Sequence, residues 1–170
     1  ILFVAAVHSD EAPNALGLIW FIEDVLPIIR DRIGQDVKLY FAGKNHSKAL
    51  EAYATDSEEF LGFVEDLDEW YDRCRVFIAP ARYAAGIPLK VIEASSRGIP
   101  VVATDLAREQ LGWVMGEMLS GESAEAIAEA CIRVYTDEDL WECLREGALN
   151  RVRRDYSRQS IIDALEAALD

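Results

Sequence analysis

Short apolar runs alternate with amphipathic stretches from the start of the chain to about residue 104. The runs at 76–78 and 101–102 are continuously apolar and rich in β-branched residues, as in strands buried on both faces of a parallel sheet. Parallel strands need crossover connections, and the amphipathic stretches supply them as helices. The pattern predicts strands at residues 2–7, 38–42, 60–64, 76–79 and 101–104, and helices at 15–29, 47–53, 67–73 and 88–97. We therefore expect a doubly wound parallel sheet of Rossmann-like α/β class.

The pattern after Gly121 is helical throughout. It predicts amphipathic helices at 124–135, 138–154 and 158–169, with Ser123 and Asp137 as N-caps of the first two. The acidic residues fall mostly on the solvent faces of these helices.

The segment 80–105 combines a strand end, a glycine loop, a helix and a second strand in the layout of a ligand site. Gly86 permits a tight turn, Pro88 suits the first helical position, and Gly98 ends the helix. A loop that runs into a helix N-terminus at the carboxyl edge of a parallel sheet offers free amides to an anion, and phosphate is the natural ligand. Lys90 and Glu93, three positions apart, share one face of this helix.

These residues resemble the donor-site signature of the family 4 retaining glycosyltransferases (glycosyl transferases group 1). The signature is a Lys-x-x-Glu-Ala helix followed by a Gly-x-Pro-Val-Val-Ala-Thr strand, and the chain has both at 90–94 and 98–104. Five further motifs of the family follow the same order, at residues 1–7, 14–21, 37–43, 60–67 and 155–157. The resemblance covers nearly the whole chain.

The resemblance implies that residues 1–170 form one Rossmann-like donor-binding domain, the C-terminal half of a GT-B type glycosyltransferase. A length of 170 residues fits one domain with an ample core. We expect a fragment whose N-terminal acceptor-binding domain, the other partner in the cleft, is absent. The expected donor is a nucleoside diphosphate sugar, and the expected reaction is transfer of the sugar with retention, in bacterial polysaccharide or glycolipid biosynthesis.

The resemblance also assigns roles to individual residues. Lys90, and less directly Lys44, would neutralise the leaving diphosphate, and Glu93 would accept hydrogen bonds from the ribose diol. The remaining expected substrate-binding residues are Gly86, Ile87, Pro88 and Leu89 of the loop and helix start, Gly62 and Phe63 at the nucleobase, Arg82 at the sugar or cleft, and His8 and Asn14 after the first strand.

Each of these residues also has a structural interpretation that the sequence leaves open. Glu93 could pair with Lys90 or with Arg97, four positions further on, and either lysine could be an ordinary solvated side chain. Gly86 could serve only the turn. In the same way His8 could be a structural histidine, Phe63 sheet core and Arg82 a packing residue.

The chain departs from the family pattern at Ala85. The family's best-known motif has an acidic residue there, eight positions before the helix glutamate, and its carboxylate reaches the transferred sugar. A subgroup with an Ala-Gly-Ile loop is nearer, although its lysine after Ile is replaced by Pro88. A degenerate, non-catalytic nucleotide-binding or interaction module of the same fold therefore stays open as the alternative.

Two other proteins with doubly wound sheets are disfavoured. A dinucleotide oxidoreductase needs a Gly-x-Gly-x-x-Gly turn after its first strand, and the chain has His-Ser-Asp-Glu-Ala-Pro-Asn there. A phosphoacceptor receiver domain uses a lysine after its last strand, and 101–105 contains none.

Composition excludes several partners. A formal charge of −14 is the wrong sign for nucleic acid, and no apolar run reaches the roughly 18 residues of a membrane helix. Three cysteines without CxxC spacing, and two isolated histidines, indicate neither a disulfide framework nor a metal site. We expect no cofactor or metal. The expected location is the cytoplasm, with peripheral contact to the inner membrane open for the full-length protein.

Overall fold

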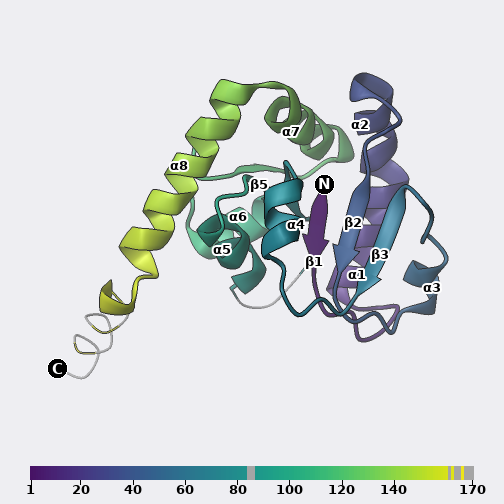
Figure 1. The fold of residues 1–170 in the computed structure, drawn as a ribbon, viewed down its shortest axis with the longest axis horizontal. Coiled ribbons are helices and arrows are strands. Elements are labelled where there is room, and N and C mark those ends of the chain that lie inside the picture. The colour runs from purple at the N-terminus through teal and green to yellow at the C-terminus, as the bar shows by residue number, and fades with distance from the viewer. Residues whose placement is uncertain (84–86, 161, 163–165, 167–170) are drawn as a thin grey trace.

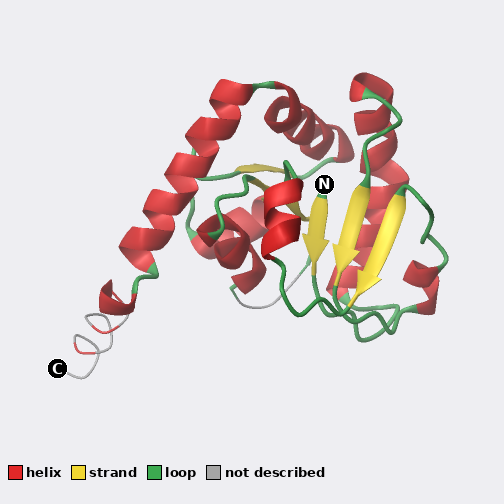
Figure 2. Ribbon diagram, viewed as in Figure 1, coloured by secondary structure: helices red, strands yellow, loops and turns green. Residues whose placement is uncertain are grey.

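Six strands form one sheet at the centre of the molecule (Figures 1 and 2). The computed structural model describes residues 1–83, 87–160, 162 and 166. The strands are β1 Leu2–Val4, β2 Leu39–Ala42, β3 Glu58–Gly62, β4 Phe77–Ala79, β5 Val101–Thr104 and β6 Leu119–Gly121. Every neighbouring pair is parallel, in the order β3-β2-β1-β4-β5-β6, which confirms the doubly wound α/β fold.

The strand order reverses direction between β1 and β4. From β1 the chain first builds outward through β2 and β3, and then returns to the other side of β1 to build β4, β5 and β6. The connections on the two sides diverge at this point, so a crevice opens beyond the carboxyl ends of β1 and β4. The predicted central strands 76–79 and 101–104 lie on one side of this crevice.

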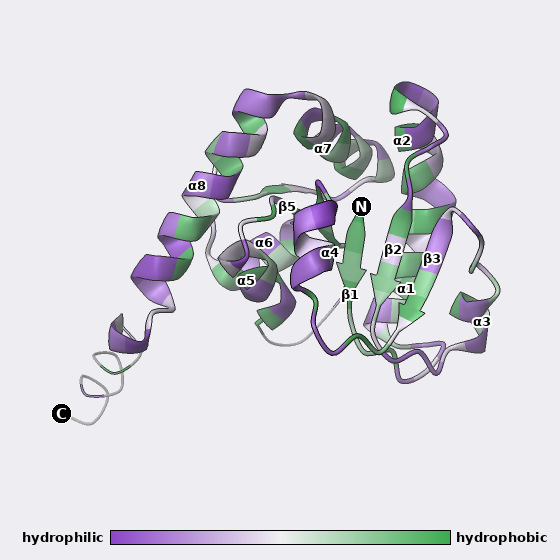
Figure 3. Ribbon diagram, viewed as in Figure 1, coloured by the Kyte–Doolittle hydropathy of each residue, from purple (hydrophilic) through white to green (hydrophobic). Residues whose placement is uncertain are grey.

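Helices cover both faces of the sheet (Figure 1). They are α1 Pro13–Trp20, η1 Phe21–Val25, α2 Leu26–Ile33, α3 Lys48–Glu51, α4 Asp68–Arg73, α5 Leu89–Ser96, α6 Asp105–Leu111, α7 Ala124–Thr136 and α8 Glu138–Asp155. Alternate strand residues point to opposite faces: Phe3 packs with η1, α2 and α7, whereas Leu2 and Phe77 pack with α4, α5 and α6. The strands are accordingly apolar, while α4 and the solvent side of α8 are hydrophilic (Figure 3).

The helix predicted at 15–29 is longer and less regular than expected. It begins at Pro13 and runs to Ile33, with the π-helical segment η1 in its middle. Pro27 has no N–H to donate and its ring crowds the carbonyl four residues before it, so regular α-helical bonding cannot continue through this position. The helix takes up the wider π-helical geometry instead, in which the Leu26 N–H bonds to the Phe21 carbonyl, five residues back.

Several predicted boundaries were wrong. β1 ends at Val4 because residues after it leave the sheet, and only Val7 makes an isolated bridge, to Asn45. β3 begins two residues early at Glu58, a polar residue whose buried carboxylate pairs with Arg30 at 2.5 Å. α6 and β6 were missed. Thr104 at the end of β5 also caps α6 through its hydroxyl, and β6 is only three residues long.

The C-terminal helices confirm their predicted caps. The Ser123 hydroxyl accepts from the Ala126 N–H, and the Asp137 carboxylate accepts from the Leu140 N–H at 2.9 Å. α8 then crosses from α7 to α5 and joins the two helical layers (Figure 1). Most of the predicted helix 158–169 lies outside the described residues.

Candidate functional site

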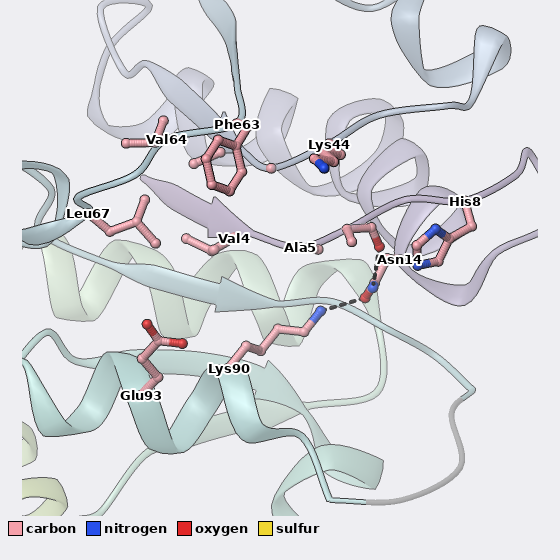
Figure 4. Close-up of a pocket in the computed structure, with 13 residues that line it drawn as sticks. Val4, Ala5, His8, Asn14, Lys44, Phe63, Val64, Leu67, Lys90 and Glu93 are labelled. Atoms are coloured by element: carbon pink, nitrogen blue, oxygen red, sulfur yellow. Dashed lines mark hydrogen bonds between the residues drawn. The ribbon is translucent and has the colours of Figure 1, made fainter.

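A cavity of about 630 Å³ opens at the carboxyl edge of the sheet, where the strand order reverses (Figure 4). Residues from five segments line it: the exits of β1, β2 and β3, the first turn of α1, and α5. The lining residues are Val4, Ala5, Ala6, His8, Asn14, Ala42, Gly43, Lys44, Phe63, Val64, Leu67, Lys90 and Glu93. Apolar side chains form much of the wall, and the polar groups are few.

The floor of the cavity depends on close contact between the exits of β1 and β2. A Cβ on Gly43 would lie 1.8 Å from the Ala5 carbonyl oxygen, and Gly43 has φ +139°. The Ala5 N–H donates to the Ala42 carbonyl, and the Gly43 N–H donates to the Gly62 carbonyl at 2.7 Å. Only glycine allows the three strand exits to lie this close together.

Lys90 projects from the first turn of α5 toward the β1 exit (Figure 4). Its ammonium donates to the Asn14 side-chain oxygen at 2.5 Å and lies 4.9 Å from the centre of the Phe3 ring. Burial lowers the pKa of Lys90 to about 8, because the charged form loses hydration in the half-buried site. The group is therefore mostly cationic at neutral pH, although it is much more easily deprotonated than an ordinary lysine.

Glu93 lies one turn further along α5 and turns its carboxylate toward the cavity (Figure 4). Arg97 pairs with Asp68, and Lys90 bonds to Asn14. Among the described residues, neither of the basic partners considered from the sequence forms an ion pair with Glu93. The exposed carboxylate is therefore free to accept hydrogen bonds from a ligand.

Lys44 and Phe63 stand across the cavity from Lys90 (Figure 4). The Lys44 ammonium lies 5.6 Å from the centre of the Phe63 ring, and 70% of Phe63 is exposed. A ring this exposed is not sheet core. Gly62, at the end of β3, has φ +67° and turns the chain into this segment. His8 completes the rim as an exposed side chain.

Other predicted site residues lie outside the cavity wall. Arg82 stacks over Trp20 at 5.1 Å and lines a separate groove with Tyr83. Ile87 and Leu89 are exposed at the start of α5, where Pro88 takes the N-cap position. The expected roles of Gly86 and Ala85 fall outside the described residues.

Comparisons with known proteins identify the family of the chain. A family model for glycosyl transferases group 1 matches residues 1–137. The chain belongs to this family. It is 30% identical over 130 residues to the lipopolysaccharide core biosynthesis mannosyltransferase LpcC of Rhizobium leguminosarum bv. viciae, an alignment that covers 75% of the chain and 37% of LpcC.

Solved glycosyltransferases have the same fold. The Anabaena Alr3699/HepE structure in complex with UDP-glucose gives a TM-score of 0.72 at 14% identity, over 98% of this chain and 48% of that one. A glycosyltransferase from Rickettsia africae gives 0.73 at 17% identity, over 98% and 46%. The chain spans less than half the length of each of these relatives.

Sequence reasoning missed much of the cavity wall in this glycosyl transferases group 1 chain. Val4 is the last residue of β1, Ala5 and Ala6 follow it, and Leu67 lies beyond the end of β3. These are small or apolar residues with no chemical signature. Their only signal is position, because parallel strands end at one edge of a sheet and the residues just beyond them face its crevice.

Among residues 1–83, 87–160, 162 and 166, no three His, Cys, Asp or Glu side chains are grouped closely enough to hold a metal ion. Within the same described part, no helix is both long and apolar enough to cross a membrane.

The first prediction concerns the Gly43 contact. Gly43→Ala adds a Cβ that overlaps the Ala5 carbonyl in addition to straining φ, so we expect it to lower the free energy of unfolding by more than about 3 kcal/mol. Gly34→Ala is the matched control, because Gly34 has φ +122° with nothing within 4 Å of its added Cβ. Urea unfolding of both variants measures the difference, and equal losses would show that the Ala5 contact has no effect.

The second prediction concerns the pH dependence that Lys90 confers. Its pKa is about 8 in the folded chain against about 10.5 when unfolded, so the unfolded chain binds more protons between these values. The Lys90 contribution to stability therefore increases as pH rises from 8 to 10.5. We expect the free energy of unfolding of the wild type, minus that of Lys90→Met, to increase by about 1 to 3 kcal/mol across this window.

The control for this measurement is Lys48→Met, which removes an exposed lysine from α3. Its difference from the wild type should stay nearly constant over the same window. If the difference between the wild type and Lys90→Met is also independent of pH, burial does not lower the pKa of Lys90.

Proposed function

We propose that the cavity binds a nucleoside diphosphate sugar and that this chain is the donor-binding half of a glycosyltransferase. One observation carries the proposal: Lys90 and Glu93 extend from one helix into one cavity at the reversal of the strand order, and neither has an ionic partner there among the described residues. A cation and a carboxylate that do not neutralise each other suit a ligand with both an anionic group and hydroxyl donors.

The diphosphate would lie against Lys90 and the start of α5. Negative charge on the leaving diphosphate grows as the glycosidic bond breaks, so a fixed cation stabilises the transition state more than the ground state. Lys44, across the cavity, would add a second cation. With two lysines and a helix N-terminus supplying positive charge, the proposed reaction needs no metal ion or other cofactor.

The ribose and base would lie on the other side of the diphosphate. The Glu93 carboxylate can accept from both vicinal hydroxyls of a ribose. Phe63 and Leu67 offer an apolar surface beside Gly62, where a nucleobase can pack and bond to the exposed backbone. His8, at the rim, would face the phosphates and the opening of the cleft.

The activity of the whole protein follows by analogy with longer relatives. LpcC is a mannosyltransferase of lipopolysaccharide core biosynthesis, and the HepE structure contains UDP-glucose. We propose transfer of a sugar with retention, in bacterial polysaccharide or glycolipid synthesis at the cytoplasmic side of the membrane. An N-terminal acceptor-binding domain, placed opposite the cavity, would complete the cleft.

A second candidate function rests on Ala85. The carboxylate that reaches the transferred sugar in the family motif is replaced here by a methyl group. A chain without it could keep the nucleotide site and lose turnover, which would make the domain a sugar-nucleotide-binding module. Sugar-nucleotide hydrolysis or transfer by the full-length protein separates the two, because a binding module gives neither.

The third prediction tests the donor site. Glu93→Ala should weaken binding of uridine or guanosine diphosphate sugars about ten- to a hundredfold, because hydrogen bonds to a charged acceptor contribute roughly 1.5 to 3 kcal/mol. The melting temperature should hardly change, since Glu93 is exposed and forms no ion pair with any described residue. Calorimetric titration of both sugar nucleotides measures the affinities.

Glu109→Ala is the matched control, since it removes an exposed glutamate from α6, outside the cavity. Its affinity should equal that of the wild type. If Glu93→Ala and Glu109→Ala bind equally well, Glu93 has no part in the site; if the wild type binds neither nucleotide, the donor assignment itself is wrong.

The fourth prediction concerns turnover. The isolated chain should bind donor without transferring its sugar, because it has no opposing surface to hold an acceptor and so lacks the proximity that supplies much of the rate. Radiolabelled sugar transfer to candidate acceptors measures this. Transfer by the isolated chain at the rate of the full-length protein would contradict the two-domain proposal.

A further inference from the structure

Asn14 connects three segments at the edge of the cavity (Figure 4). It occupies the second position of α1, its side-chain N–H donates to the Ala6 carbonyl after β1 at 3.2 Å, and its side-chain oxygen accepts from the Lys90 ammonium. The two bonds fix the orientation of the amide, because Ala6 offers only an acceptor and the ammonium only donors.

The place of Asn14 is set by close backbone packing. α1 lies so near the exit of β4 that a Cβ on Gly17 would be 2.7 Å from the Pro80 carbonyl oxygen. Pro13 starts the helix one residue before Asn14 and restricts φ there. The asparagine is therefore presented by a rigid helix start, on an element separate from the one that carries Lys90.

An asparagine suits this position where an aspartate would not. An aspartate could not donate to the Ala6 carbonyl, and its charge would cancel that of Lys90. The amide oxygen accepts one proton of the ammonium without cancelling its charge, and the Phe3 ring also contacts the cation as a neutral group. Two ammonium protons remain for another acceptor.

We propose that Asn14 is the positioning residue of the donor site, holding the Lys90 ammonium in the cavity with its charge uncompensated so that the donor diphosphate can bind to it. The proposal rests on the proposed function for the identity of the anion. It assigns Asn14 a role through Lys90, not in direct contact with the phosphates.

Several other ionisable groups lie on the elements around the cavity, and their roles differ. His8 and Lys44 line the same cavity from the β1 and β2 exits, and Glu93 lies on the same helix. Asp10, in the loop before α1, is engaged by Ser47 and the Ala49 N–H. Tyr71 on α4 lies near Glu93, and its pKa is raised first by burial and then by that carboxylate.

The fifth prediction, a titration of the free protein, tests the link between Asn14 and Lys90. The chain has only four lysines, at 38, 44, 48 and 90, so carbon-13 labelling at Cε resolves Lys90 by NMR against the other three. In Asn14→Leu the Lys90 midpoint should fall by about 0.5 to 1 pH unit, because the ammonium loses its acceptor. In Asn14→Asp it should rise by about 1, because a carboxylate favours the charged form.

Asn45→Leu is the control, since Asn45 is a loop asparagine after β2 that bonds to Ser47 and not to Lys90. Its Lys90 midpoint should match the wild type. If the midpoint is also unchanged in both Asn14 variants, Asn14 does not hold Lys90 and the proposal is wrong. Melting temperatures of all variants show whether each is folded.

Calorimetry with UDP-glucose and GDP-mannose at pH 7 tests the link to the diphosphate. Asn14→Leu should weaken binding about three- to tenfold in the wild type and have no effect in a Lys90→Met background, since its effect passes through the lysine. Asn14→Asp should also weaken binding, although it raises the Lys90 midpoint, because the carboxylate competes with the phosphates for the ammonium.

The outcomes separate this proposal from the proposed function. An equal loss from Asn14→Leu with and without Lys90 would mean that Asn14 acts on the ligand or the fold directly, which overturns the positioning role and leaves the donor site standing. Binding of neither sugar nucleotide by the wild type would overturn both. The proposal is established if Asn14→Leu weakens binding only when Lys90 is present and the two Asn14 variants shift the Lys90 midpoint in opposite directions.

Discussion

The reversal of strand order between β1 and β4 is the constraint on which the site depends. A parallel sheet places all strand exits at one edge, and a reversal there separates the helices that follow β1 and β4. α1 and α5 consequently stand on opposite sides of one crevice, and Asn14 and Lys90 meet across it. The cavity is thus a product of topology, and no single side chain opens it.

Close backbone approaches convert this topology into a shaped cavity. Gly43 lets the β2 exit lie against Ala5, and Gly17 lets α1 lie against the exit of β4. A larger residue at either position would move a wall of the site. The apolar faces of α2, α5 and α7 stabilise the sheet, whereas these glycine contacts determine where its edge residues lie.

The charge of Lys90 in the cavity destabilises the folded chain. Lys90 loses hydration, and the groups that contact it, the Asn14 amide and the Phe3 ring, are neutral. A carboxylate partner would stabilise the folded chain more. Although the chain has 31 acidic residues, no carboxylate among the described residues forms an ion pair with Lys90. An uncompensated cation is the expected cost of the proposed diphosphate site.

Much of this organisation was predictable from the sequence, because it depends on local patterns. Continuous apolar runs marked β4 and β5, and Ser123 and Asp137 marked the starts of α7 and α8. The Lys-x-x-Glu spacing put two cavity-lining side chains on one helical face. The resemblance of several ordered motifs identified the family. Local patterns failed where they were short or ambiguous, as in the three residues of β6 and at Pro27, where the helix widens instead of ending.

The tertiary structure alone decided which of the open interpretations hold. Spacing along α5 allowed Lys90 and Arg97 as partners of Glu93, but Asp68 and Asn14, brought in from other elements, bind these two residues. The separation of 76 positions between Asn14 and Lys90 has no local signature. Arg82 was grouped with the site by its nearness in sequence, yet it stacks on Trp20. Partner choice depends on distances in space, and these are set when the strands pair and the helices pack.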